Sequence, residues 1–266
     1  MRKWSVIICS INAAKFAHVT QCYERLLAGR SYEIIGIHDA ASLCEGYNRG
    51  IAQASGDILV FSHDDVLLLD PGFADKVETR LGTHALLGFA GTTEVRDAHW
   101  WAAGTASQRG AVAHAAPGAR SLSLFVYGVG DEPVDSVQAI DGMCMVAHRR
   151  AVNSVQFDAT TFDGFHLYDM DFSYRVHLAG LGVGVMNDSP IIHMSSGDFD
   201  AVWDTYRERF LYKHADALGL GPDAVIPAPQ PIQARAADFQ SPAELIAAWQ
   251  PRLLRRATIA LLRGQT

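Results

Sequence analysis

The chain has 266 residues, of which 49% are hydrophobic, and its formal charge is -7 at pH 7. This length and apolar content allow one large core, or one domain with an appendage, and they exclude a disordered chain. The negative charge provides no general attraction to nucleic acid, so we expect small-molecule ligands and no nucleic-acid partner. The four cysteines form no C-x-x-C pair, which argues against a zinc cage and against a disulfide framework.

The N-terminal residues carry no pattern typical of export. Only a short apolar run, Val6 to Ile11, follows the basic residues Arg2 and Lys3, and it falls short of a signal-peptide core. No segment approaches about 18 uninterrupted apolar residues, the length that indicates a membrane span. We therefore expect a cytoplasmic protein with reduced thiols.

The N-terminal third of the chain alternates between apolar runs and helical patterns. Buried strands are expected at the short apolar runs, residues 4–11, 32–38, 57–62 and 85–90. Helices are expected between them, over residues 12–28, 42–54 and from 70 onward. Ser42 with Glu45 has the capping-box spacing, and Pro71 after Asp70 fits the first helical position. This order predicts an α/β fold with a mostly parallel sheet and right-handed crossovers.

The middle of the chain is less regular. The stretch from Asp97 to Arg120 is rich in glycine, alanine and serine and has weak periodicity. We predict a long loop or short hairpins there, which could form a lid over a ligand site. Beyond it, strands are expected at residues 137–147, 182–186 and 190–193, and helices at residues 168–179 and 199–210.

The C-terminal part divides at a proline-rich stretch. Residues 221–240 are predicted to be a linker after a catalytic domain at 1–220, because prolines interrupt regular structure. Residues 241–266 are predicted to form a basic amphipathic helix, separable from catalysis, with Leu245 and Trp249 on its apolar face. Two roles stay open for this helix: peripheral contact with the inner face of the membrane, or packing and self-association.

Three segments contain the residues most suited to chemistry. His63, Asp64 and Asp65 follow the apolar strand at 57–62, and the carboxyl ends of strands are where open α/β sheets bind ligands. Carboxylates there favour a divalent cation and a phosphorylated ligand. Asp169 and Asp171 begin a predicted helix, and Arg175, four residues after Asp171, favours a structural ion pair for that acid.

The third segment ends in His193, at the end of a short apolar strand, where a lone histidine is more often a core residue than a ligand. In their order and spacing, the three segments resemble the family 2 glycosyltransferases, and more closely the branch with histidine in place of the first metal-motif acid. The resemblance covers roughly residues 6–214. It implies a GT-A fold, which is a Rossmann-like, mostly parallel central sheet flanked by helices, with the C-terminal helix as an appendage.

The resemblance also implies an activity: metal-dependent, inverting transfer from a nucleoside-diphosphate sugar to a hydroxyl of a sugar or glycan acceptor. Asp65 and His193 would hold the divalent metal, Mn²⁺ or Mg²⁺, and Asp169 matches the general base. The residues that it places at the donor are Ser10, Asn12, Asp39, Tyr47, Asn48, His63 and Asp64. The substrate-side candidates are Asp141 and Gly142, which match the turn beside the donor sugar, together with Asp171.

Two positions depart from the family pattern. His63 stands where the D-x-D motif has its first acid, and Tyr168 stands in place of the glutamate of a Glu-Asp pair. Trp100 and Trp101, in the long loop, could stack on an acceptor sugar, or could equally anchor the loop itself.

The sequence disfavours one other class of protein and leaves two open. A Rossmann dehydrogenase is disfavoured because residues 11–17 contain no glycine where the dinucleotide fingerprint needs several. A metal-dependent nucleotidyltransferase or phosphohydrolase stays open, because a carboxylate pair and a late histidine would serve those reactions too. A degenerate module that binds sugar nucleotides without turnover also stays open.

Overall fold

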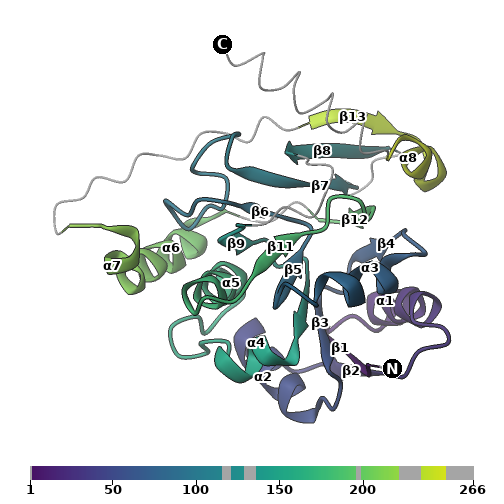
Figure 1. Ribbon diagram of the computed structural model, residues 1–266, viewed down its shortest axis with the longest axis horizontal. Helices are drawn as coiled ribbons and strands as arrows, with labels where there is room; N and C mark the ends of the chain where they lie inside the picture. Colours follow the sequence, from purple (N-terminus) through teal and green to yellow (C-terminus); the bar gives the residue numbers. More distant parts are fainter. Residues whose placement is uncertain (1, 116–120, 129–135, 196–198, 222–234, 250–266) are drawn as a thin grey trace.

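Two sheets make up the protein in the computed structural model, which describes residues 2–115, 121–128, 136–195, 199–221 and 235–249. The first sheet has six strands (Figure 1). In spatial order these are β11 (Val183–Val185), β5 (Leu86–Gly88), β10 (Cys144–His148), β3 (Ile58–Ser62), β1 (Trp4–Cys9) and β2 (Tyr32–Ile37). Strand β10 runs antiparallel to its neighbours, whereas the other pairs are parallel.

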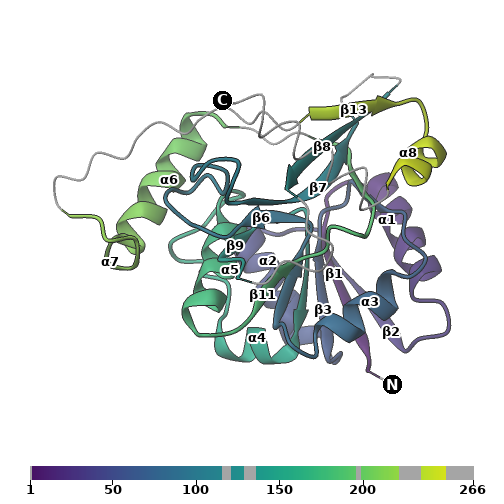
Figure 2. The same cartoon turned by 45° about the horizontal axis from the view of Figure 1, so that its top comes forward.

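Helices cover both faces of this sheet (Figures 1 and 2). One face is covered by α1 (Ala13–Leu26) and α3 (Phe73–Arg80). The other is covered by α2 (Leu43–Gln53), α4 (Arg149–Ser154) and α5 (Tyr168–Leu178). Strand β3 is buried throughout, and the ring of Phe61 in that strand packs on Tyr47 of α2, with ring centroids 5.1 Å apart. The opening β-α-β-α-β order and the parallel pairing predicted from the sequence are confirmed.

A second sheet lies across one end of the first (Figure 2). Its main path is β13 (Arg235–Phe239), β8 (Leu122–Gly128), β7 (Gln108–His114), β12 (Ile191–His193) and β4 (Val66–Leu68). Strand β6 (Ala90–Thr92) pairs with β7, and β9 (Ala139–Ile140) pairs with β6. The apolar runs at 85–90 and 137–147 were each predicted as one strand. Each run instead supplies a strand to both sheets.

Small residues explain why the extent of β7 was not predicted. Residues 108–114 were expected to belong to a long loop or to short hairpins. They form a seven-residue strand that pairs antiparallel with β8, as in a hairpin, and also pairs with β6 and β12. The strand contains Gly110, Ala111 and Ala113, which give little apolar periodicity. Gly110 has a φ of +116°, and a Cβ added there would overlap with the carbonyl oxygen of Phe89. The close approach of neighbouring backbone therefore requires a residue without a side chain.

Two helix predictions need correction. Helix α3 begins at Phe73 and not at Pro71, because Asp70 forms a turn before the helix and its Oδ1 accepts a hydrogen bond of 2.9 Å from the Gly72 amide. Helix α6 (Ala201–Lys213), followed by the short α7 (Ala215–Leu218), was expected from residue 199, but it begins at Ala201, because Asp200 caps it. Phe199 and Val202 are 51% and 54% exposed. The buried residues are Trp203, Tyr206, Phe210 and Leu211.

The C-terminal segment is part of the second sheet. Strand β13 pairs antiparallel with β8, so residues 235–239 are not the linker that the sequence predicted. Helix α8 (Pro242–Ala248) buries Leu245 completely, and the indole nitrogen of Trp249 donates a hydrogen bond of 3.1 Å to the carbonyl oxygen of Asn187. Most of the predicted linker, and the arginines of the predicted basic helix, lie outside the described residues.

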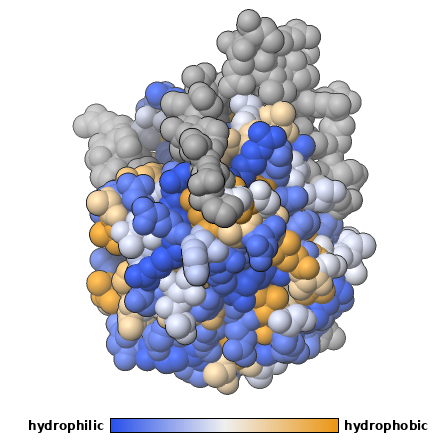
Figure 3. Space-filling model, turned by 90° about the vertical axis from the view of Figure 1, so that its left-hand side faces the viewer, coloured by the Kyte–Doolittle hydropathy of each residue, from blue (hydrophilic) through white to orange (hydrophobic). Residues whose placement is uncertain are grey.

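The described part of the protein has no membrane-spanning type of helix, and its apolar surface in Figure 3 is divided. No helix in the described ranges has both the length and the apolar character that crossing a membrane requires. The face that carries α6 and α7 is mainly hydrophilic, with apolar side chains in small separate groups (Figure 3). Scattered groups of this kind are ordinary on a protein surface.

Candidate functional site

The end of β3 forms the first part of the site. Because β1 and β3 are parallel neighbours, with Ile8 opposite Ser62, their carboxyl ends meet at one edge of the sheet. There, the Ser10 hydroxyl donates a hydrogen bond of 2.6 Å to Asp64 Oδ2. The Lys15 ammonium, from the first turn of α1, lies 3.7 Å from Asp64 Oδ1 and 3.5 Å from Asp65 Oδ2.

Strand pairing in the second sheet brings His193 to the same place. Strand β12 runs antiparallel to β4, and His193 is opposite Val66, the residue after Asp65. The His193 Nε2 atom lies 3.3 Å from Asp65 Oδ1 and 3.2 Å from His63 Nδ1. One side-chain ligand atom from each of His63, Asp65 and His193 lies within 4.8 Å of the others.

These distances fit a shared divalent ion. Ligands bonded at about 2.1 Å to one ion lie roughly 3.0–3.4 Å apart, in tetrahedral or octahedral geometry. Burial, followed by the charge of His193, lowers the pKa of His63 to about 4, so its imidazole is neutral near pH 7. Burial opposes ionisation of Asp65, but its hydrogen bond with His193 holds the pKa of that carboxyl below its usual value. Neutral imidazole and ionised carboxylate are the forms that bind metals.

The start of α5 supplies the second part of the site. Leu167, immediately before the helix, has the left-handed φ of 58°, which is uncommon for a residue with a side chain. The next residue, Tyr168, places its hydroxyl 2.6 Å from His63 Nε2. The Gly142 amide donates a hydrogen bond of 2.8 Å to Asp169 Oδ2. An added Cβ at Gly142 would overlap with the Tyr168 hydroxyl, so only glycine fits there.

Asp169 has the electrostatic character of a base. Burial, followed by the charge of Asp141, raises the pKa of its carboxyl to about 7. A carboxylate of this kind is a much stronger proton acceptor than an ordinary aspartate, because the best catalytic pKa lies near the working pH.

A cavity of about 440 Å³ joins the two parts. Its lining includes His63 and His193, which with Asp65 we call the ion cluster. It also includes Asp141, Gly142 and Asp169, which lie at or near the start of α5. Aromatic side chains form much of the remaining wall, namely Trp100, Trp101, Phe125, Tyr127, Phe165, Phe199 and Trp203. Trp100 is buried, and its ring meets that of Tyr127 edge-on at 4.8 Å between centroids. The tryptophans therefore both anchor the loop and line the cavity.

Several donor candidates lie outside this cavity. Asn12 caps α1, since its Oδ1 accepts hydrogen bonds of 3.0 Å from the Ala14 and Lys15 amides. Asp39 is exposed and forms an ion pair of 2.5 Å with Arg49. Tyr47 is completely buried in the core, so it cannot line the nucleoside pocket for which the sequence suggested it.

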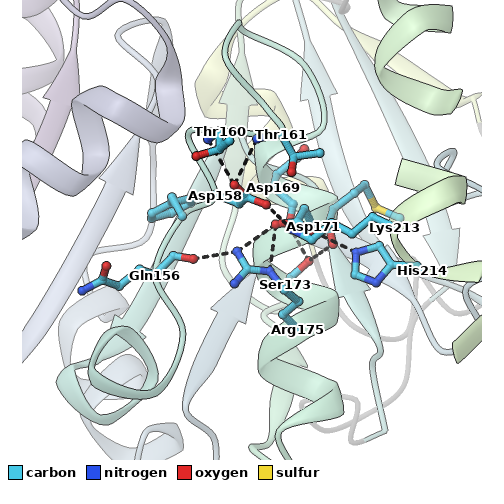
Figure 4. Close-up of polar contacts among 12 residues, drawn as sticks. Gln156, Asp158, Thr160, Thr161, Asp169, Asp171, Ser173, Arg175, Lys213 and His214 are labelled. Atoms are coloured by element: carbon cyan, nitrogen blue, oxygen red, sulfur yellow. Dashed lines mark hydrogen bonds and ion pairs between the residues drawn. The ribbon is translucent and has the colours of Figure 1, made fainter. Parts of the chain in front are cut away.

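Asn48 and Asp171 also have structural contacts in place of the expected ligand contacts. The Asn48 side chain donates to the carbonyl oxygen of Phe157 at 2.8 Å and accepts from its amide at 3.2 Å, which fixes the segment before α5. The Asp171 side chain is 1% exposed and is surrounded by three basic groups (Figure 4). These are Arg175 at 2.8 Å, Lys213 at 2.7 Å and His214 at 2.9 Å.

Asp171 therefore joins α5 to the end of α6 and does not face the cavity. Its ion pair with Arg175, predicted from the four-residue spacing, is confirmed. Burial opposes its ionisation, but the hydrogen bond from His214 and the charges of Arg175 and Lys213 lower the pKa of this carboxyl.

The structure adds residues that sequence reasoning missed. His114 and Arg235 line the cavity from β7 and β13, two strands that the sequence pattern did not reveal. Ser195 Oγ lies 3.0 Å from His193 Nε2. Lys15 is also new, and its position in the first turn after β1 was the one available signal, since that turn lies at the carboxyl edge of the sheet.

Comparisons with known proteins were made for family, sequence and structure. The model of the Glycosyltransferase like family matches residues 5–214. No match was found among curated proteins. The mannosyltransferase PcManGT from Pyrobaculum calidifontis, solved with GDP-Man and Mn²⁺, has 11% identity and a TM-score of 0.50, over 99% of this chain and 74% of that one.

Two further solved structures are similar at a lower level. Residues 1–349 of TarS from S. aureus have 12% identity and a TM-score of 0.43, over 80% of this chain and 72% of that one. A197 from STIV has 11% identity and a TM-score of 0.43, over 74% of this chain and 87% of that one. The family model covers most of the chain, so the protein belongs to the glycosyltransferase-like family and is a glycosyltransferase with the GT-A fold.

Proposed function

We propose that this protein transfers a sugar from a nucleoside-diphosphate sugar to a hydroxyl of a sugar or glycan acceptor, with inversion at the anomeric carbon and with a divalent ion. One observation supports this most: His63 and His193 of the ion cluster line the same cavity as Asp141 and Asp169. The proposed site for the leaving diphosphate and the proposed base for the acceptor therefore line the same cavity.

The donor diphosphate is assigned to the carboxyl edge of β1 and β3. The Lys15 ammonium, 3.5 Å from Asp65, adds a positive charge at this edge. A divalent ion held by Asp65 and His193 would neutralise the charge that develops on the diphosphate as it leaves. Asp64, held by the Ser10 hydroxyl, is left to orient the donor.

The acceptor side contains the base. Asp169, with its pKa of about 7, takes the proton from the acceptor hydroxyl. The hydroxyl oxygen then bonds to the anomeric carbon, while the bond from that carbon to the phosphate oxygen breaks and its electron pair leaves with the diphosphate. A single base opposite the leaving group gives inversion, because retention would need a second carboxylate placed as a nucleophile. The ring of Trp101, which lines the cavity and is only partly buried, is suited to stacking on the acceptor sugar.

A thermal-shift screen of nucleoside diphosphates, with and without divalent ions, tests the donor assignment. One nucleoside diphosphate is expected to raise the melting temperature only when the ion is present. Binding at 100 times Kd stabilises a protein by about 2.7 kcal/mol, which is several degrees for a chain of this size. Asp65→Asn should abolish this shift, and Asp204→Asn, which changes an exposed aspartate on α6, should keep it.

Product analysis then separates the reactions. Incubation of the donor sugar nucleotide with acceptor glycans should release the nucleoside diphosphate, with the sugar joined to the acceptor. Release of sugar 1-phosphate or of a nucleoside monophosphate would replace this proposal with a nucleotidyltransferase or phosphohydrolase. Tight ion-dependent binding without turnover of any donor tested would leave a binding module.

A further inference from the structure

Two histidine nitrogens face each other in the ion cluster. His63 Nδ1 and His193 Nε2 are 3.2 Å apart, and Asp65 Oδ1 lies 3.3 Å from the same His193 atom. The three residues come from two separate places in the fold: the loop after β3 and the end of β12. Nitrogen atoms therefore outnumber carboxylate groups in this cluster.

The contact with Tyr168 determines what His63 Nδ1 can do. The Tyr168 hydroxyl lies 2.6 Å from His63 Nε2, at the opposite side of the ring. A neutral imidazole has one N–H, and a phenol oxygen can accept a hydrogen bond from it. When Nε2–H donates to Tyr168, the lone pair of Nδ1 points toward His193 and Asp65. Only this tautomer makes His63 a ligand on that side.

We propose that His63 is a third ion ligand through Nδ1, so that the site consists of two imidazoles and one carboxylate, with Tyr168 as the residue that fixes the His63 tautomer. Imidazole ligands favour transition-metal ions, whereas Mg²⁺ favours carboxylate, carbonyl and water oxygens. The site therefore selects Co²⁺ and Zn²⁺, and less strongly Mn²⁺, over Mg²⁺. Gly142 belongs to this arrangement, because a side chain there would occupy the position of the Tyr168 hydroxyl.

This inference also joins the two departures from the family pattern. His63 and Tyr168, each in place of an expected acid, are in direct hydrogen-bond contact. A hydrogen bond from an outer residue typically orients a metal-bound histidine, and its loss weakens metal binding. The inference rests on the proposed transferase only for the role of the ion, since ion binding is a property of the protein alone.

Titration calorimetry on the full, untagged chain, after chelator treatment and without donor, tests the ion preference. Co²⁺ should bind at least about 100-fold more tightly than Mg²⁺, with Mn²⁺ between them. The visible absorption of bound Co²⁺ gives a second measurement that reports directly on its ligands. Equal affinity for Co²⁺ and Mg²⁺ in the unmodified protein would overturn the proposal, without the need for any variant.

Three variants test the ligands. His63→Gln should weaken Co²⁺ binding at least about 10-fold and change the Co²⁺ spectrum, because a ligand is lost. Tyr168→Phe keeps all three ligands, but should weaken Co²⁺ binding about 10-fold and alter the same spectrum. His18→Gln, which changes an exposed histidine on α1, should alter neither. An unchanged spectrum in His63→Gln would remove His63 from the ligand set, and unchanged binding in Tyr168→Phe would remove its positioning role.

The transferase proposal and the ion-ligand proposal can be overturned independently of each other. A protein that binds nucleoside diphosphate as well with Mg²⁺ as with Co²⁺ would keep the transferase assignment and overturn the ion preference. A protein that selects Co²⁺ through His63, but binds no nucleoside diphosphate, would keep the ion site and overturn the donor assignment.

Discussion

Two acids two residues apart on α5 have opposite environments. Asp169 lines the cavity and has a raised pKa, whereas Asp171 is enclosed by basic groups and has a lowered pKa. The sequence alone already favoured Asp169 over Asp171 as the base, because only Asp171 has an arginine four residues later with which to form a structural ion pair. Their different environments predict different effects when each is changed to asparagine.

Asp169→Asn should lower kcat at least about 10²-fold and leave donor binding intact, since a base acts on the proton in transit and not on the diphosphate. In the unmodified protein, kcat should rise as pH increases through about 7, where this carboxyl loses its proton. Initial rates from pH 5 to pH 9 measure both effects. Near-normal turnover in the variant would transfer the base role to another group.

The stability of the same variant has a predictable sign. The folded protein keeps the Asp169 proton up to about pH 7, whereas the ordinary value for this group is 3.8. Folding is therefore less favourable as pH rises between these values. The melting temperature of Asp169→Asn should exceed that of the unmodified protein by a margin that grows up to about pH 7 and is constant above it.

Asp171→Asn should instead destabilise the fold, because Arg175, Lys213 and His214 would lose their shared counter-charge. Loss of one partner of a buried ion pair costs about 3–5 kcal/mol. We expect the lower end of this range, because Arg175 and Lys213 are partly exposed. Urea denaturation measures the loss, with Asp204→Asn as the exposed control. If Asp171→Asn were stable but inactive, Asp171 would be the better candidate for the base.

The resemblance paired Asp65 and His193 as metal ligands and placed His63 at the donor, and the structure brings all three side chains together. Sequence reasoning could not place Tyr47 and Asn48 correctly. The spacing of residues in a helix shows which of them share a face, but not whether that face meets the core or a cavity. The orientation of Tyr47 depends on the rings of Phe61 and Phe157, and that of Asn48 on the Phe157 backbone. Both phenylalanines come from distant segments.

At the scale of elements, β13 completes the second sheet and α8 packs against that sheet. Leu245 and Trp249 pack with Leu124, Val126 and Ile192 in a separate apolar cluster. Ile192 precedes His193, so this cluster supports a candidate ion ligand. Strand β13 could not be predicted, because Arg235–Phe239 is a largely exposed edge strand with no alternation of apolar residues.

Trp249→Ala should therefore destabilise the protein by about 3 kcal/mol, through lost burial and the lost bond to the Asn187 carbonyl. It should also weaken ion binding. Ile246→Ala, on the exposed side of the same helix, is the matched control, and calorimetric melting with ion titration measures both properties. If a chain that ends at Gly221 were as stable as the full chain, the segment would be the separable appendage that its prolines suggested.

At the scale of the whole molecule, the order of the first strands could be predicted from alternating apolar and helical patterns, and the resemblance to family 2 glycosyltransferases implied the GT-A class. The second sheet could not. Its strand β6 continues the apolar run of β5, and its strand β9 begins the apolar run that ends in β10. Each run is apolar on both sides of the break, so hydrophobicity does not show where the chain passes from one sheet to the other. Gly88 ends β5 and Gly142 lies between β9 and β10, so glycines stand at both breaks, but they become meaningful only when their neighbours in space are known.

Two of the places where the chain passes between the sheets, from β5 to β6 and from β9 to β10, lie side by side. Gly91 is opposite Ile140 in the β6–β9 pair, and the Asp141 amide donates a hydrogen bond of 2.9 Å to the carbonyl oxygen of Ala90. Backbone hydrogen bonds at these two adjacent crossings hold the sheets together, so a rotation of one sheet against the other would break them. His63 follows one sheet and His193 ends a strand of the other. We therefore expect the spacing of these two histidines to change little when an ion or a substrate binds.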